Sequence, residues 1–181
     1  MTKLDSAVTH WVLAHRTPWL TQVMRVVTTF GGSAVLVPVI VGVGLLLRRR
    51  RGTWAPLGFL VAAYVGALLA YNVGKRLVGR RRPPLATWLV GASGYALPSG
   101  HATQSAAVYA ALAVVLIPAG WRARRKAAAR IAVSAGVALI GASRVYLGVH
   151  WASDVLAGWV VGLLWWRALL ETGLGRRVRN A

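Results

Sequence analysis

Two ionisable side chains stand four residues apart in an otherwise apolar stretch, SRVYLGVHWASD (143–154). If this stretch is helical, His150 and Asp154 lie on the same helix face. The carboxylate can then accept the imidazole N–H, fix its tautomer and make the other ring nitrogen a better base or nucleophile. A buried polar pair that stabilises helix packing is the alternative, but ionisable groups are costly inside a membrane segment and indicate a functional site.

Two neighbouring features could bind an anion. Arg144 follows the small residues Gly-Ala-Ser at a predicted helix end. In GYALPSGHATQSAA, Pro-Ser-Gly precedes an apolar helix, so Ser99 lies near the N-cap and Gly100 at the positive end of the helix dipole. His101 comes next and could exchange a proton with a bound group. Taken alone, this motif favours simple helix capping with His101 as an interfacial histidine.

A third basic feature is KRLVGRRRPP (75–84). We expect Lys75 and Arg82 to lie close together at the end of a helix, because Pro83 and Pro84 cannot continue it. On its own, the segment could be a basic collar at the membrane interface. The neighbouring Arg76, Arg80 and Arg81 are compatible with a strongly anionic head group or with surrounding anionic lipid.

Together, these features predict a site for a phosphoryl group. Three cations and the amides of a helix N-terminus match its negative oxygens, and two histidines supply a nucleophile and a proton donor. No metal or other cofactor is expected. The chain has no cysteine, and its three acidic residues are scattered through the sequence at Asp5, Asp154 and Glu171.

The elements that must position these residues are membrane helices. The chain is 57% hydrophobic, and its 181 residues predict one domain. A bilayer core requires about 20 apolar residues per helix. Five runs qualify or nearly do, at 33–47, 54–74, 101–121, 127–143 and 145–166. We therefore expect an all-α, polytopic membrane bundle with five transmembrane helices, in which residues 1–31 form a sixth, tilted span or an interfacial helix.

The basic residues indicate how the bundle is oriented. The net charge of +19 is carried largely by blocks between apolar runs, which favours a topology signal over nucleic-acid binding. Three blocks fall on one side if the helices alternate, and that side should be cytoplasmic; they lie at 48–51, 122–126 and in the basic tail 174–181. The predicted site residues, within 75–154, then lie at the extracytoplasmic ends of their helices.

The three motifs resemble the signatures of the type-2 phosphatidic acid phosphatase (PAP2) superfamily, and of its bacterial membrane lipid phosphatases in particular. They are K-x-x-x-x-x-x-R-P at 75–83, P-S-G-H at 98–101 and S-R-x-x-x-x-x-H-x-x-x-D at 143–154. All three match in order and at full internal spacing. Membrane members of the family usually have six spans, so the short N-terminal segment is where this sequence departs from the pattern.

The resemblance implies a role for each residue. His150 would attack phosphorus to form a phosphohistidine, Asp154 would orient it, and His101 would protonate the leaving oxygen and later help to activate water. The phosphoryl oxygens would be held by Lys75, Arg82, Ser99, Gly100 and Arg144. It also implies metal independence, sensitivity to vanadate and an active site on the extracytoplasmic face.

The predicted function is hydrolysis of a lipid phosphate or lipid pyrophosphate by a multi-pass protein of the cell membrane. Phosphatidic acid, phosphatidylglycerol phosphate and polyprenyl phosphates or pyrophosphates such as undecaprenyl pyrophosphate all stay open as substrates. The expected partners are this lipid and the bilayer, and the oligomeric state is open. The alternatives are a non-catalytic lipid-phosphate binding or transport protein and, on the same phosphate-binding residues, a vanadate-dependent haloperoxidase, for which the expected soluble scaffold is absent.

Overall fold

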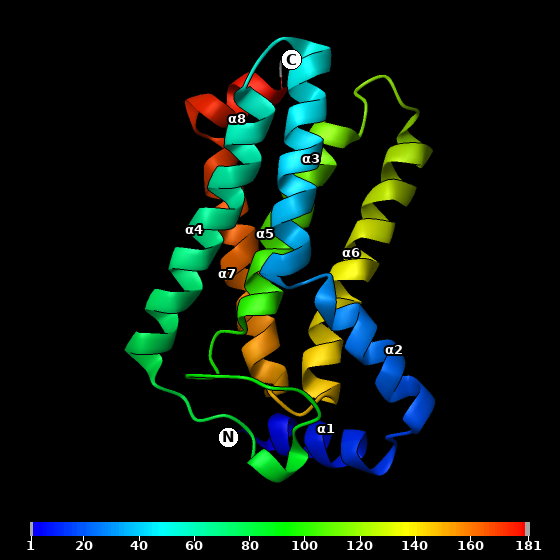
Figure 1. Cartoon of the computed structure of the whole chain (residues 1–181), viewed down its shortest axis with the longest axis vertical. Helices are drawn as coiled ribbons and strands as arrows, with labels where there is room; N and C mark the ends of the chain where they lie inside the picture. Colours follow the sequence, from blue (N-terminus) through cyan, green and yellow to red (C-terminus); the bar gives the residue numbers. More distant parts are fainter. Residues whose placement is uncertain (1, 180–181) are drawn as a thin grey trace.

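The computed structural model describes residues 2–179, and in this part of the chain every regular element is a helix. The elements are α1 (Lys3–Ala14), α2 (Pro18–Thr29), α3 (Ser33–Arg51), α4 (Ala55–Val78), a short 3-10 helix (Leu85–Thr87), α5 (Gly100–Leu116), α6 (Ala123–Tyr146), α7 (Ala152–Leu170) and α8 (Gly173–Arg179). Helices α3 to α7 run along the long axis, α1 lies across one end and α8 lies at the other (Figure 1). The predicted all-α bundle is confirmed.

The helix lengths agree with a multi-pass membrane protein. Helices α4, α6 and α7 are each long and apolar enough to cross a bilayer, and α2 and α3 together meet the same test as a pair bent by 46°. Helix α5 is apolar throughout but only 17 residues long. It lies at the centre of the bundle, where its side chains are mostly buried against α4 and α7.

Small residues allow α5 and α7 to pack closely. A Cβ atom on Gly162 of α7 would come within 2.4 Å of the Thr103 carbonyl oxygen of α5. A Cβ atom on Gly158 would likewise lie 2.8 Å from the Ala102 Cβ atom and 2.8 Å from the Ser99 carbonyl oxygen. Close packing of this kind is common between membrane helices. It brings the beginning of α5 directly beside the beginning of α7.

The expected helix 145–166 is wrong at its beginning. Helix α6 continues to Tyr146, and α7 begins only at Ala152, after a five-residue connection. Gly148 in this connection has φ +76°, and a Cβ atom there would lie 2.0 Å from the Thr87 carbonyl oxygen. Only glycine meets both conditions without strain. His150 and Asp154 therefore do not share a helix face, since His150 precedes the helix that contains Asp154.

The end of α4 also differs from the expectation. The helix ends at Val78 with Gly79 in the left-handed conformation (φ +63°), four residues before Pro83. The stop is therefore a glycine C-cap and not the proline pair. Lys75 lies inside the last turn, and Arg82 lies in the loop that follows.

The N-terminal segment packs against the same end of the bundle as the predicted site. Arg16, between α1 and α2, donates hydrogen bonds to the carbonyl oxygens of Tyr146 (2.7 Å) and Thr87 (2.8 Å). The Tyr146 hydroxyl in turn lies 3.1 Å from the Thr17 amide and the Thr21 hydroxyl. Helix α1 thus lies across the bundle end, while α2 continues into α3 as the bent pair.

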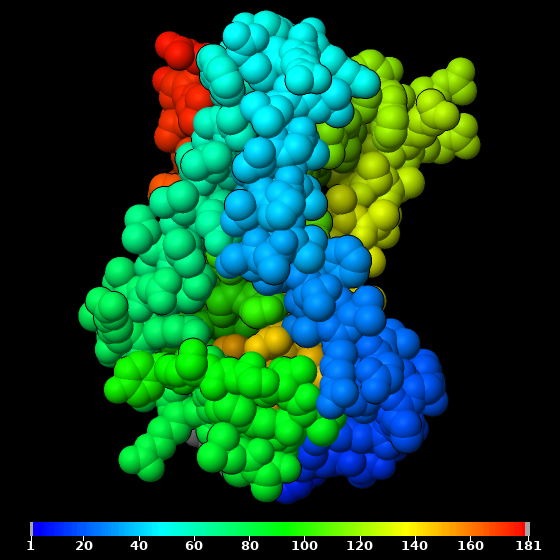
Figure 2. All heavy atoms as spheres, viewed as in Figure 1, coloured from blue at the N-terminus to red at the C-terminus, as the bar shows by residue number. Residues whose placement is uncertain are grey.

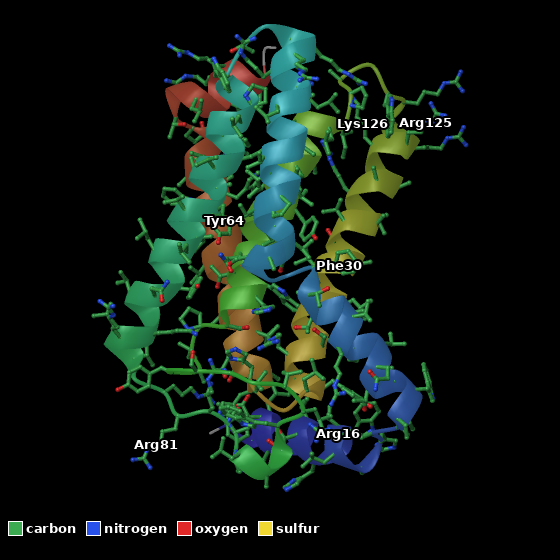
Figure 3. The ribbon with its side chains drawn as sticks, viewed as in Figure 1. Arg16, Phe30, Tyr64, Arg81, Arg125 and Lys126 are labelled. Atoms are coloured by element: carbon green, nitrogen blue, oxygen red, sulfur yellow. The ribbon has the colours of Figure 1, made fainter. Side chains whose placement is uncertain are left out.

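The opposite end carries the basic blocks. Arg48–Arg51 end α3, and Arg176, Arg177 and Arg179 lie in α8. Arg125, at the beginning of α6, points away from the bundle at this end and Lys126 follows it, whereas Arg16 and Arg81 lie at the other end (Figure 3). The expectation that the three blocks share one end is met.

Candidate active site

The predicted site residues come from five different segments that converge at one end of the bundle. Figure 2 shows an opening between the loop 79–99 (green) and the α2–α3 segment (blue), with yellow and orange atoms from the region of the α6–α7 connection visible inside. The segments are the last turn of α4 with Lys75, the following loop with Arg82, and the beginning of α5 with Ser99 at the N-cap followed by Gly100 and His101. The other two are the last turn of α6 with Arg144 and the beginning of α7, which His150 and Asp154 flank. The Ser99 amide donates to the Asp154 carbonyl oxygen at 2.9 Å, which fixes two of the motifs to each other.

His150 and Asp154 are paired despite the break in the helix. The His150 Nδ1 atom lies 3.4 Å from Asp154 Oδ2, a close contact but not a hydrogen bond, and Oδ2 accepts a hydrogen bond from the Trp151 amide at 2.9 Å. Asp154 is the third residue of α7 and caps it, so the helix N-terminus holds the carboxylate beside the imidazole. Burial lowers the pKa of His150 to about 4, against the opposing effect of Asp154. The imidazole is therefore neutral at pH 7.

Arg82 faces the other nitrogen of this imidazole. Its Nη1 atom lies 3.2 Å from His150 Nε2 and donates to the Val149 carbonyl oxygen at 2.7 Å. Its Nε and Nη2 atoms donate to the carbonyl oxygens of Gly94 and Ser93, at 2.9 and 2.8 Å. Backbone carbonyls on three sides hold the guanidinium in place, with one edge turned to the histidine.

Arg144 and Ser99 carry polar atoms that have no partner. Arg144 is 6% exposed and donates from Nη1 to the Thr28 hydroxyl at 2.7 Å. The Arg144 Nε atom and the Ser99 hydroxyl are buried and find no hydrogen-bond partner within residues 2–179. An unsatisfied buried polar group costs about 1–3 kcal/mol. Both atoms are therefore suited to binding an anion that enters the site.

The remaining predicted residues lie close enough to act on the same ligand. Lys75 stacks over the Tyr71 ring, with Nζ 5.3 Å from its centroid, and interacts electrostatically with Arg82, Arg144 and Asp154. A Cβ atom on Gly100 would lie 3.2 Å from the same ring, so Tyr71 packs between the first two motifs. As the first residue of α5, Gly100 has an amide with no acceptor inside the helix.

His101 packs against the connection between α2 and α3. A Cβ atom on Gly31 would come within 3.2 Å of the imidazole Cδ2 atom, and one on Gly32 within 3.5 Å of Nε2. The charges of Arg144, Lys75 and Arg82, and the ring of His150, all interact with this imidazole. All eight predicted residues therefore meet around one site.

Sequence reasoning missed a second group of residues, centred on Arg80. Asp5 and Asp154 are far apart in the sequence, but Arg80 bridges them in the folded protein, at 2.6 Å to each. Thr28, which orients Arg144, was also missed. The only sequence signal for Asp5 was the spacing of Thr2 and Asp5, which form a capping box at the beginning of α1.

Asp5 is fully buried and ionised. Burial opposes its ionisation, but hydrogen bonds from the Ser153 amide and from Arg80 outweigh that effect and hold the pKa of Asp5 well below its usual range. Within residues 2–179, no group of three His, Cys, Asp or Glu side chains could share a metal ion. The third acid, Glu171, is exposed at the opposite end and pairs with Arg167.

A helical membrane bundle in which a histidine–carboxylate pair faces several cations and free donors is the architecture of a membrane phosphatase. The sequence profile of the PAP2 superfamily matches residues 56–176. The chain belongs to this superfamily, as its three motifs predicted, and it is an enzyme of the phosphatase class.

Named relatives agree with this assignment. The chain is 37% identical over 161 residues to phosphatidylglycerophosphatase B of Bacillus subtilis, covering 88% of this chain and 78% of the relative. It is 29% identical over 148 residues to an undecaprenyl-diphosphatase of Sulfolobus acidocaldarius, covering 79% of this chain and 66% of the relative.

Two crystal structures are also similar. A transmembrane PAP2 type phosphatidylglycerolphosphate phosphatase from Bacillus subtilis superposes with a TM-score of 0.87 at 33% identity, over 96% of this chain and 85% of that one. Aquifex aeolicus LpxE superposes with a TM-score of 0.75 over 94% of this chain and 97% of that one. At 20% identity, the second similarity concerns the fold alone.

Proposed function

We propose that this protein hydrolyses a lipid phosphate or lipid pyrophosphate through a phosphohistidine on His150, without a metal ion. The observation that carries the proposal is the set of unpartnered buried donors, Arg144 Nε and the Ser99 hydroxyl, in the same site as a neutral imidazole. Donors of this kind match phosphoryl oxygens, and they stabilise the charge that develops during transfer.

The first step uses the free lone pair of His150. Its Nε2 atom attacks phosphorus, the bond from phosphorus to the lipid oxygen breaks, and a protonated His101 donates its proton to that oxygen. Asp154 accepts the Nδ1–H of His150 and stabilises the positive charge that forms on the ring. Lys75, Arg82, Arg144, Ser99 and the Gly100 amide bind the phosphoryl oxygens.

The second step restores the enzyme. His101, now neutral, takes a proton from water as the water oxygen attacks phosphorus. The P–N bond breaks, inorganic phosphate leaves and His150 is neutral again. For a pyrophosphate substrate, the leaving oxygen in the first step belongs to the lipid monophosphate instead of an alcohol.

The identity of the substrate is proposed from the relatives. Phosphatidylglycerol phosphate is our first candidate, because the 37% identical relative is named a phosphatidylglycerophosphatase. Undecaprenyl pyrophosphate is the second, after the more distant archaeal relative. Phosphatidic acid is the third, from the family signature.

The direct test is phosphate release by the purified protein in detergent with EDTA present, on each of these three lipids. We expect release by the wild type, inhibition by vanadate, and no release by His150→Ala with an unchanged melting temperature. Brief incubation with ³²P-labelled lipid should leave an acid-labile, alkali-stable label on the wild type. A protein that binds the lipids without releasing phosphate would instead be a lipid-phosphate binding protein.

We also propose that the site opens on the extracytoplasmic side of the cell membrane, since the basic blocks at the other end favour the cytoplasm. The chain has no cysteine, so single cysteines report topology cleanly. Arg81→Cys and Arg125→Cys place thiols at exposed positions on opposite ends. In intact cells, a membrane-impermeant maleimide should label the first and not the second; the reverse result would place the site in the cytoplasm.

A further inference from the structure

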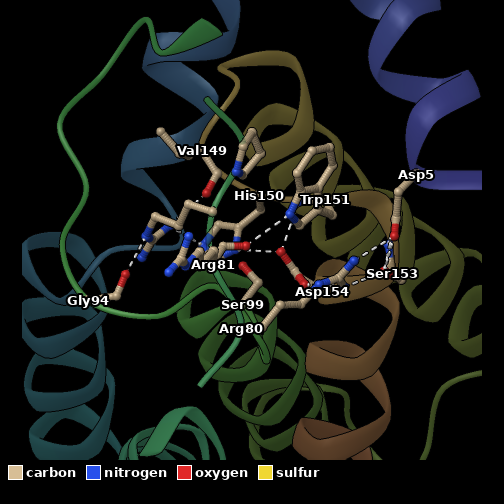
Figure 4. Close-up of polar contacts among 12 residues, drawn as sticks. Asp5, Arg80, Arg81, Gly94, Ser99, Val149, His150, Trp151, Ser153 and Asp154 are labelled. Atoms are coloured by element: carbon tan, nitrogen blue, oxygen red, sulfur yellow. Dashed lines mark hydrogen bonds and ion pairs between the residues drawn. The ribbon is translucent and has the colours of Figure 1, made fainter. Parts of the chain in front are cut away.

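Behind the active-site histidine, Asp154 belongs to a continuous chain of three charged side chains, and the catalytic steps above do not use the other two, Arg80 and Asp5. Arg80 donates from Nη1 to Asp154 Oδ1 and from Nη2 to Asp5 Oδ2, both at 2.6 Å (Figure 4). Both carboxylates are completely buried, and the Arg80 side chain is 17% exposed. The chain runs from the N-terminal helix α1, through the loop after α4, to the first turn of α7.

Asp5 is fixed more firmly than a surface ion pair. Its Oδ1 atom accepts hydrogen bonds from the Ser153 amide (3.0 Å) and the Ser153 hydroxyl (2.8 Å). Its Oδ2 atom accepts from the Thr2 amide at 3.1 Å, in addition to Arg80. Asp5 therefore closes the beginning of its own helix and binds the beginning of α7 at the same time.

We infer that Asp5 and Arg80 are positioning residues for the proposed phosphatase reaction, through which helix α1 orients the Asp154 carboxylate behind His150. The inference rests on the proposed function, because it gives Asp154 its catalytic partner. Neither Asp5 nor Arg80 touches the phosphoryl group in this scheme; each acts through Asp154.

The two carboxylate oxygens of Asp154 have different partners, and this difference supports the positioning role. Arg80 holds Oδ1, and Oδ2 is left to the Trp151 amide and to His150 Nδ1. Without Arg80, Oδ1 loses its partner and the Trp151 amide alone restrains the carboxylate, so Oδ2 is held less firmly in its direction toward the imidazole. An imidazole with the wrong tautomer presents an N–H, instead of a lone pair, to phosphorus.

Asp5 supplies the charge that this arrangement needs. His150 already faces two cations, Arg82 from the loop and Arg144 from α6, together with His101 from α5. Lys75 from α4 adds a third positive charge that acts on Arg82, Arg144 and Asp154, and Asp154 is the anion among these groups. Arg80 alone would neutralise Asp154 and weaken its effect on His150. Because Asp5 is an equally close partner, Arg80 orients Asp154 while its own charge is balanced from the other side.

The contacts of α1 make this inference testable without undocking the helix. Arg16 independently binds the carbonyl oxygens of Tyr146 and Thr87, and these bonds do not involve Asp5. Asp5→Asn is isosteric and can keep the hydrogen bonds from Ser153 while removing the charge. Arg81→Gln is a matched control for Arg80, because the adjacent Arg81 side chain is exposed and points away from the site (Figure 3). Glu171→Gln is the control for loss of an acid.

The kinetic experiment compares phosphate release by Asp5→Asn, Arg80→Gln, Arg80→Lys and the double variant with the two controls. We expect each single variant of the pair to lose kcat by roughly tenfold or more with KM changed by less than about twofold, because the substrate contacts are intact. Arg80→Lys should recover part of kcat. The double variant should lose much less than the product of the two single losses, since the residues act as one unit.

The pH profile of kcat provides a readout that a purely structural role would not give. In Arg80→Gln, loss of the positive charge favours protonation of His150, so the acidic limb of the kcat profile should move to higher pH. Loss of Asp5 leaves Arg80 uncompensated, so in Asp5→Asn the limb should move to lower pH. Shifts in the same direction, or equal losses from Arg81→Gln, would overturn the inference.

A spectroscopic measurement separates failure of the inference from failure of the proposed function. The chain has four histidines, so ¹⁵N-histidine spectra in detergent micelles can be assigned with the help of His150→Ala. We expect His150 to be held with its proton on Nδ1 in the wild type and to become a mixture of tautomers in Asp5→Asn and Arg80→Gln. If the wild type hydrolyses none of the lipids, the proposed function is lost, but these spectra still decide the inference. An unchanged His150 tautomer in both variants would overturn it.

Discussion

The Nη1 atom of Arg82 lies 3.2 Å from the Nε2 atom of His150, so a guanidinium covers the nitrogen that we expect to attack phosphorus. With the proton of His150 on Nδ1, toward Asp154, the Nε2 lone pair accepts this contact. A phosphoryl oxygen must replace His150 Nε2 as the acceptor of the Arg82 Nη1–H before the Nε2 lone pair is free to attack. The exchange is favourable, because a hydrogen bond between two charged groups is stronger than one to a neutral ring.

The first prediction concerns the shape of this guanidinium. Arg82→Lys keeps the charge but loses the planar group that binds three backbone carbonyls and faces His150. We expect kcat/KM for lipid phosphate hydrolysis to fall by about 10²-fold, the loss typical for one donor to a developing negative charge. Arg76→Lys, at an exposed position of the same basic segment, should retain wild-type kinetics. Equal rates for the wild type and Arg82→Lys would mean that only the positive charge of Arg82, and not its planar shape, matters for the reaction.

The second prediction concerns Thr28, whose hydroxyl orients Arg144 from helix α2. Thr28→Val removes the hydroxyl with little change of shape. Since a hydrogen bond to a charged group is worth about 1.5–3 kcal/mol, we expect kcat/KM to fall by roughly tenfold or more. Thr29→Val is the control: the neighbouring Thr29 is exposed, and its hydroxyl donates to the Val26 carbonyl oxygen of its own helix. Comparable activity in the two variants would remove Thr28 from the site.

The third prediction concerns stability against pH. The pKa of His150 is lowered to about 4 in the folded protein, from an ordinary value of 6.5. Between these values the unfolded chain binds a proton that the folded protein excludes, so stability should fall as pH falls from about 6.5 toward 4. The lowered pKa of Asp5 affects stability in a different pH range. The stability that it contributes is lost only as pH falls below 3.8, the ordinary pKa of this carboxyl group.

Thermal unfolding in detergent between pH 8 and 4.5 checks this prediction. His150→Gln should lose part of the acid-side decrease in melting temperature. His10→Gln, which replaces an exposed histidine of α1, should keep the whole decrease. An identical pH dependence in the wild type and His150→Gln would mean that this imidazole is not held neutral by burial.

The fourth prediction concerns the α6–α7 connection. In Gly148→Ala, the new methyl group meets the Thr87 carbonyl oxygen in a backbone conformation that costs roughly 1–2 kcal/mol for alanine. We expect a lower melting temperature and a loss of activity greater than the loss of folded protein, because His150 is two residues away. Gly42→Ala, on an open face of α3, should leave both quantities near wild type. Normal activity in Gly148→Ala would contradict the role of this turn.

Much of the fold and most of the site were predictable, because they depend on local properties of the chain. Apolar length identified the helical segments, and the basic blocks correctly grouped their ends. The site residues fall at helix ends, so alternation of the helices was enough to bring the three motifs together. The break before α7 was missed, since Val149 and Trp151 continue the apolar pattern and only Gly148 marks the turn.

The contacts between distant segments could not be predicted from the sequence alone. Nothing near Asp5 or Thr28 in the chain indicates which helix will face it after folding. Arg80 resembles its neighbours Arg76 and Arg81 in type, and only the packing of α1 over the bundle end distinguishes it as a bridge between two buried carboxylates. Burial and partner choice at these positions are properties of the complete bundle.

The bond between Asp5 and Ser153 spans 148 residues of sequence, which has a consequence for how the enzyme is made. A ribosome synthesises Asp5 well before Ser153, which emerges only after helices α2 to α6 have been made. Until then, α1 has no α7 to dock on, and Asp154 and His150 do not yet exist. A chain that ends before α7 would therefore carry the cations of the first motif but not His150, the proposed nucleophile. Activity should begin only after α7 is in place.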